Sequence, residues 1–114
     1  MTFEQYCHEA SEFARYPRLG NNLNYTILGL VGEAGEVANA WKKYIRDCEN
    51  KEVFVGSNSE RDIIEELGDV LWYFMACCSE LDISPSKVAA LNIRKLERRT
   101  RLHKATLRRK NAKD

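Results

Sequence analysis

The 114-residue sequence contains no uninterrupted apolar run long enough to cross a bilayer. Its start, Met1-Thr2-Phe3-Glu4-Gln5, has no basic segment followed by an apolar run, which is the pattern of a secretory signal. We therefore expect a cytoplasmic protein that makes no contact with a membrane.

Cysteine and histidine are too sparse for the frameworks that they usually build. The four cysteines show neither C-x-x-C spacing nor a regular disulfide pattern, so we expect them to be reduced and structural. A di-iron carboxylate bundle needs Glu-x-x-His motifs. The two histidines, His8 and His103, do not follow a glutamate by three residues, so this class is set aside.

Charge is abundant and unevenly distributed. Hydrophobic residues make up 44% and charged residues 31%, which fits one helix-rich globular domain. Residues 1–93 hold 8 Lys/Arg and 15 Asp/Glu, a balance of −7, whereas residues 94–114 hold 10 and 2, a balance of +8. An acidic body with a basic end indicates a metal site in one part and a phosphate or nucleic-acid contact in the other.

The apolar pattern predicts four helices and therefore an all-α fold. The first is capped by Thr2 and ends before Pro17, and the second runs from about Tyr25 to Asp47. A third helix is predicted from Ser59 to about Leu81, after a loop from Cys48 to Asn58. A fourth helix begins at Ser84-Pro85. We expect one domain, residues 1–103, followed by a basic, flexible tail, residues 104–114.

Two acidic pairs stand inside strongly apolar helices, in Glu33-Ala34-Gly35-Glu36 and Glu66-Leu67-Gly68-Asp69. Positions three apart lie about 60° apart on a helix, so each pair presents two carboxylates to one region. Like charges that close repel each other, and a cluster of them usually holds a cation. A single Glu-x-x-Glu is most often solvated surface; two pairs favour a site for Mg²⁺ or Mn²⁺.

Two further features concern packing. Gly29, Gly32 and Gly35 each cost about 1 kcal/mol in a helix interior, so their spacing predicts the close approach of another backbone. The third helix is apolar almost all round, which predicts that a second subunit covers part of it. We expect a homodimer or a dimer of dimers.

With these motifs the chain resembles the all-α nucleoside triphosphate pyrophosphohydrolases, the MazG-like family, whose motif is E-x-x-E followed by E-x-x-D. The resemblance covers about residues 2–103 and is closest to the short, single-domain phage and bacterial members. It is carried by residues 25–37, 66–73 and 92–96. It implies a four-helix MazG-like bundle completed by oligomerisation.

The resemblance also implies hydrolysis of a (d)NTP, between its α and β phosphates, to the (d)NMP and pyrophosphate. It assigns Glu33, Glu36, Glu66 and Asp69 as catalytic metal ligands for Mg²⁺, with Mn²⁺ as a substitute. Ions held there would lower the pKa of the attacking water. The proton acceptor, one of these carboxylates or Glu65, is left open.

Substrate contacts follow from the same resemblance and from charge. Lys95, with Arg98 or Arg99, would hold phosphate oxygens. Asn92 and Tyr73 match positions near the nucleotide. Trp41 or Trp72 would stack on a base, although aromatic residues at helical spacing are more often core. Lys42 and Lys43 are further candidates, and the tail after His103 lacks the glycine usual in short relatives, so its part in substrate selection is left open.

One alternative of another class uses the basic end. A nucleic-acid-binding or adaptor module would bind through residues 94–113, with an affinity that falls steeply with salt. It leaves the two acidic pairs without a role.

Overall fold

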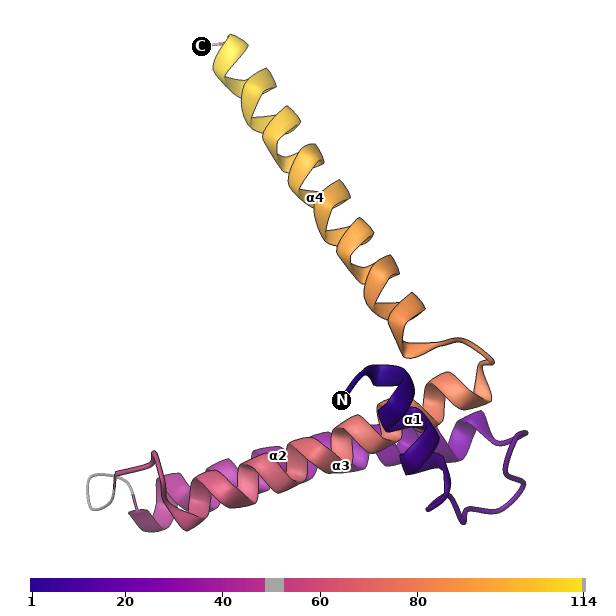
Figure 1. The fold of residues 1–114 in the computed structure, drawn as a ribbon. Helices are drawn as coiled ribbons and strands as arrows, with labels where there is room; N and C mark the ends of the chain where they lie inside the picture. Colours follow the sequence, from indigo (N-terminus) through magenta and orange to yellow (C-terminus); the bar gives the residue numbers. More distant parts are fainter. Residues whose placement is uncertain (49–52, 114) are drawn as a thin grey trace.

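The computed structural model describes residues 1–48 and 53–113, and within these ranges it is all-α (Figure 1). Its four helices are α1 (Phe3–Ser11), α2 (Leu23–Cys48), α3 (Asn58–Glu80) and α4 (Pro85–Lys113). The predicted all-α class is confirmed. None of the described helices combines the length and the apolarity needed to span a membrane.

Helices α2 and α3 lie side by side as an antiparallel hairpin, which forms the long axis of the body (Figure 1). Counting along α2 from Thr26 to Tyr44 at alternating spacings of four and three gives a row of residues that includes Leu30 and Val37. Every residue of this row is buried or half-buried. Thr26 is completely buried, and its hydroxyl donates to the Leu23 carbonyl at 3.0 Å. The acidic stretches of both helices are therefore brought into one hairpin.

The buried core lies at one end of this hairpin, where α1 crosses α3. Met75, Ala76, Cys77 and Cys78 are buried there, together with Ala10 of α1. The indole Nε1 of Trp72 donates to the Ala10 carbonyl at 3.2 Å and ties the two helices together.

The loop between α1 and α2 is fastened to the end of α3 by Glu80. Its carboxylate accepts hydrogen bonds from the Tyr16 hydroxyl at 2.5 Å, the Gly20 amide at 2.9 Å and the Asn22 amide at 3.0 Å. Asn22 in turn accepts from the Tyr25 amide at 3.2 Å and so caps the start of α2. Glu80 thus sets where α2 begins.

The helix ends agree with the predictions in part. Thr2 caps α1, and Ser84 accepts from the Lys87 amide at 3.1 Å at the start of α4. The predicted Ser59 cap of the third helix is wrong: the cap is Ser57, which accepts from the Glu60 amide at 3.1 Å after a turn at Gly56 with φ +82°. Residues 49–52 of the predicted loop lie outside the described residues.

The first turn of α4 contacts the first turn of α1, where the Ser86 hydroxyl donates to the Glu4 carboxylate. Helix α4 then projects away from the hairpin, and every described residue from Leu91 onward is exposed (Figure 1). The helix continues to Lys113, whereas we expected a flexible tail after His103. The mobility of this tail stays a prediction.

Within the described part of the chain, one apolar face of the α2–α3 hairpin is uncovered, and we call it the α2–α3 apolar face. On α3 it comprises Ile64, Leu67 and Leu71, which are 59%, 52% and 36% exposed. On α2 it includes Ile27, Val31, Trp41 and Ile45. Only the C-terminal part of α3 is therefore buried within one chain, and the second subunit that was expected to cover the rest stays a prediction.

Candidate metal and nucleotide site

Three carboxylates converge between α2 and α3, and we call them the acidic cluster. Glu33 comes from α2, and Glu66 and Asp69 come from α3; one oxygen of each lies within 4.8 Å of the others. Glu33 belongs to the row of α2 that faces α3, and Glu66 and Asp69 are three residues apart on α3. The structure thus brings together three of the four predicted acids.

The negative charges of the acidic cluster repel one another. Desolvation raises the pKa of Glu33 above its ordinary value, and the negative charges of Asp69, Glu66 and Glu36 raise it further. Asp69 is exposed and the other two members are half-buried, so the cluster opens to solvent on one side. Carboxylate oxygens in this arrangement fit a small hard cation such as Mg²⁺ or Mn²⁺, whose charge would relieve the repulsion.

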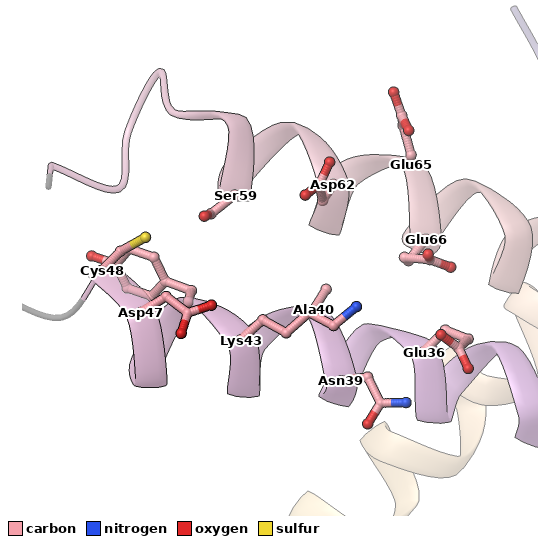
Figure 2. Close-up of a pocket in the computed structure, with 11 residues that line it drawn as sticks. Glu36, Asn39, Ala40, Lys43, Asp47, Cys48, Ser59, Asp62, Glu65 and Glu66 are labelled. Carbon is pink, nitrogen blue, oxygen red and sulfur yellow. The ribbon is translucent and has the colours of Figure 1, made fainter.

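Glu36 stands at the edge of the cluster rather than among its three converging oxygens. It lies nearly one helical turn beyond Glu33 and lines an adjoining pocket together with Glu66 (Figure 2). Its charge still acts on Glu33. The fourth predicted acid therefore joins the cluster to the pocket.

The adjoining pocket, which we call the polar pocket, has a volume of about 320 Å³ and runs along the groove between α2 and α3. Figure 2 shows Asn39 and Lys43 of α2 on one wall and Asp62, Glu65 and Glu66 of α3 on the other. The described residues that line it are Glu36, Asn39, Ala40, Lys43, Tyr44, Asp47, Cys48, Ser59, Asp62, Glu65 and Glu66.

Among the described residues, Lys43 lines the polar pocket and Lys42 does not. Asn39 was not singled out from the sequence, yet Glu36, Asn39 and Lys43 follow one another at spacings of three and four. That spacing places them on one side of the helix, and it could have identified Asn39 from the sequence.

Tyr73 lies beside the cluster on the other side. Its ring packs against Gly29, where an added Cβ would lie 2.1 Å from Tyr73 Cε1. Desolvation raises the pKa of Tyr73, and Tyr25, Glu33 and Asp69 raise it further. The close approach predicted at the glycines is therefore made at Gly29 by a side chain, while nothing within the described part of the chain comes within 4 Å of a Cβ at Gly32 or Gly35.

A second hollow, the aromatic pocket, adjoins Tyr73. It has a volume of about 230 Å³ and is lined by Phe13, Arg15, Tyr16, Tyr25, Trp72 and Tyr73. The rings of Tyr16 and Tyr25 are stacked with centroids 5.1 Å apart, and Trp72 meets Tyr73 edge-on at 5.0 Å. Trp72 and Tyr73 were predicted near the nucleotide. Arg15 and Tyr16 were missed because they belong to a loop without periodicity, and Phe13 was missed because its spacing placed it on the apolar side of the first helix.

Two groups of predicted substrate contacts lie elsewhere in the chain. Asn92, Lys95, Arg98 and Arg99 are exposed on α4, the helix that projects away from the α2–α3 hairpin (Figure 1). Trp41 stacks on Tyr44 at 5.2 Å and meets the Phe54 ring edge-on at 5.4 Å. It belongs to an aromatic group near the end of the hairpin and does not line the polar pocket.

An antiparallel helical hairpin that gathers three carboxylates beside a polar pocket defines an all-α protein with a candidate divalent-cation site. Residues 22–103 match the model of the MazG nucleotide pyrophosphohydrolase domain, and the chain belongs to this family. Members of the family typically depend on a divalent metal.

The chain is also similar to the Gene 37 protein of Mycobacterium phage L5. The two are 41% identical over 95 residues, which cover 79% of this chain and 81% of the phage protein. No solved structure gives a significant match.

Proposed function

We propose that the protein hydrolyses a (d)NTP between its α and β phosphates, consuming one water and releasing the (d)NMP and pyrophosphate. The observation that carries the proposal is the convergence of Glu33, Glu66 and Asp69 within 4.8 Å. Membership in the pyrophosphohydrolase family supports the reaction class.

The acidic cluster would hold Mg²⁺, or Mn²⁺ in its place, with Glu36 contributing from the edge. The bound ion would neutralise phosphate charge and lower the pKa of the attacking water. Glu65 lines the polar pocket next to Glu66, which makes it a candidate proton acceptor beside the cluster members themselves. Lys43 supplies a positive charge to the same pocket for a phosphate oxygen.

The aromatic pocket offers a place for the nucleoside. Tyr73 borders both this pocket and the acidic cluster, so a base held there lies next to a triphosphate held by the carboxylates. Its rings provide faces on which a base can stack. Trp72 and Tyr73 therefore keep their proposed role, and Phe13, Tyr16 and Tyr25 join them.

The uncovered α2–α3 apolar face supports a homodimer. Two antiparallel hairpins that pack through such faces form a four-helix bundle, which removes the exposed side chains from water. Because α4 projects from its own body, we propose that Asn92, Lys95, Arg98 and Arg99 reach substrate bound by another copy.

The direct test incubates the full chain with a panel of (d)NTPs and Mg²⁺ and measures pyrophosphate and orthophosphate separately. We expect pyrophosphate, abolished by EDTA and restored by excess Mg²⁺. Asp69→Asn should lower kcat about a thousandfold or more, since it removes a charge from the cation site. Glu9→Gln, an exposed change on α1, is the matched control and should leave the rate unchanged.

No pyrophosphate from any nucleotide would defeat the proposal. The exposed basic stretch of α4 favours one alternative, a nucleic-acid-binding module. Salt-sensitive binding of DNA or RNA by a chain that hydrolyses no nucleotide would replace the enzyme with that module.

A further inference from the structure

The projecting part of α4 carries a regular row of small, apolar and weakly polar residues that has no partner within the described part of the chain. The row, here called the α4 seam, consists of Ala89, Ile93, Leu96, Thr100, His103 and Leu107. The spacings alternate between four and three, which is the a/d pattern of a coiled coil. Ile93, Leu96 and Leu107 are 54%, 47% and 46% exposed. A helix of this kind gains most of its stability from packing, so the seam calls for a partner helix.

The surface of the seam has the form that a partner helix needs. A hollow on α4 is lined by Ile93, Leu96, Glu97, Thr100 and Arg101. The first four stand at positions i, i+3, i+4 and i+7, which surround one side chain of a facing helix in knobs-into-holes packing. The Thr100 hydroxyl donates to the Leu96 carbonyl at 3.0 Å, so burying the seam leaves this donor satisfied.

We propose that the α4 seams of two copies pack against each other as a short antiparallel coiled coil. With Ile93, Thr100 and Leu107 at a, the flanking e positions are Glu97 and Lys104. Antiparallel pairing sets e against e, so Glu97 of each copy meets Lys104 of the other, twice in the pair. Leu96 of each copy then packs against Leu107 of the other.

Parallel pairing is disfavoured by the same charges. It sets g against e, which places Arg99 opposite Lys104 twice and leaves two repulsive contacts at the interface. Glu97 is the only acid between Ser86 and Lys113, so its place at an e position decides the direction.

A nucleic acid would not cover the seam. It would bind the basic residues on the other faces of α4, such as Arg94 and Arg98, and leave Ile93, Leu96 and Leu107 in water. The seam is also separate from the α2–α3 apolar face. The proposed α4 pair would therefore be an association step of its own, distinct from a dimer formed through the α2–α3 apolar face.

Sedimentation velocity of the full chain over a range of concentrations tests the association. Leu96→Lys should raise the dissociation constant of the α4 step about tenfold or more, since it removes a buried leucine from both halves of the pair. The matched control is Leu102→Lys, which changes an equally large side chain that is 64% exposed and off the seam. Circular dichroism should show equal helix content in both variants.

The outcomes separate this proposal from the α2–α3 dimer and from the enzyme. The coiled-coil proposal is overturned if the wild type and Leu96→Lys have the same mass at every concentration. This holds whether that mass is a monomer or a dimer. A wild-type chain that associates only when a 20-mer DNA is added would also overturn the proposal. Pyrophosphate release is measured separately and does not enter either result.

One further variant tests the direction of the pair. Lys104→Glu sets the introduced carboxylate of one copy against Glu97 of the other in the antiparallel pair and should weaken association, with recovery in the Glu97→Lys/Lys104→Glu double variant. In a parallel pair the same Lys104→Glu change meets Arg99 and strengthens association. A tighter assembly of the single variant would therefore contradict the antiparallel arrangement.

Discussion

At the scale of single residues, Glu80 fastens the segment that joins α1 to α2 to the end of α3. Its carboxylate accepts three hydrogen bonds from the segment that joins α1 to α2. The Tyr16 hydroxyl and the amides of Asn22 and Gly20 stabilise the charged form, so the pKa of Glu80 is lowered. Because Tyr16 stacks on Tyr25, the order of the aromatic pocket depends on Glu80.

We predict an acid-sensitive contribution to stability from this carboxylate. A lowered pKa in the folded state means that the contribution is fully present above the ordinary value of 4.5 and is lost as the pH falls through the folded value. The melting temperature of Glu80→Gln, measured between about pH 3 and pH 7, should therefore lie below that of wild type at neutral pH and approach it in acid.

Glu9→Gln serves as the control for this series, since it removes an exposed carboxylate of α1. A constant gap between wild type and Glu80→Gln across the whole pH range would show that the Glu80 hydrogen bonds do not depend on its charge.

The pKa of Glu33 is shifted in the opposite direction from that of Glu80. Its raised pKa indicates that the folded chain holds this carboxylate among other negative charges at a cost. A cost that packing does not require is typical of a functional site, where a ligand supplies the missing charge. This is the residue-scale reason to expect a cation in the acidic cluster.

At the scale of elements, the contact between α2 and α3 depends on a glycine. Gly29 leaves room for the Tyr73 ring, and an added Cβ would lie 2.1 Å from it. We predict that Gly29→Ala displaces the ring, destabilises the fold by about 1–3 kcal/mol and lowers kcat/KM for the nucleotide. Urea unfolding and steady-state kinetics measure the two effects.

Gly32→Ala is the matched change on the same helix. Nothing in the described part of the chain lies within 4 Å of a Cβ there, so it should stabilise the fold by about 0.5–1 kcal/mol through the helix propensity of alanine. Equal effects of the two substitutions would mean that the Tyr73 ring does not pack on α2 in solution.

At the scale of the whole molecule, the exposed apolar surface is the dominant feature. The α2–α3 apolar face lies on the opposite side of α3 from Asp62, Glu65 and Asp69, as the helical positions show. Under the proposed function, the hairpin would offer one face to a second copy and keep the other for the cation and the substrate.

We predict that Leu67→Lys separates the dimer formed through this face. Leu67 is 52% exposed in one chain, and a leucine buried at an interface contributes about 1.5–3 kcal/mol, so the dissociation constant should rise roughly ten- to a hundredfold. Leu28→Lys is the control: Leu28 is 72% exposed and lies about 100° around α2 from Ile27, outside the face. Light scattering that shows the same mass for both variants would contradict this interface.

Much of the fold followed from local patterns. The four helices, their order, the Thr2 and Ser84 caps and the family motif are all properties of short stretches, which periodicity and capping residues reveal. The Ser57 cap was missed because two serines compete within three residues, and only the turn at Gly56 decides between them.

Residue spacing alone predicted the candidate site only where its residues share a helix, and the pairing of the two helices was expected from the family resemblance. Glu66 and Asp69 are set by spacing on α3, whereas their distance from Glu33 depends on the register of α2 against α3. Phe13 and Tyr16 reach the aromatic pocket through a loop held by Glu80, which no local pattern reveals. The position of Lys95 depends on the direction in which α4 leaves the body (Figure 1).

The sequence by itself determined that the chain is helical, which residues carry its acidic motifs, and where its charge changes sign, since these depend on neighbours along the chain. The tertiary structure decided that Glu33, Glu66 and Asp69 converge while Glu36 stands at their edge, and that α4 extends away from them. The reason is that interhelical register and helix direction arise from contacts between distant residues, such as Glu80 with Tyr16 and Tyr73 with Gly29.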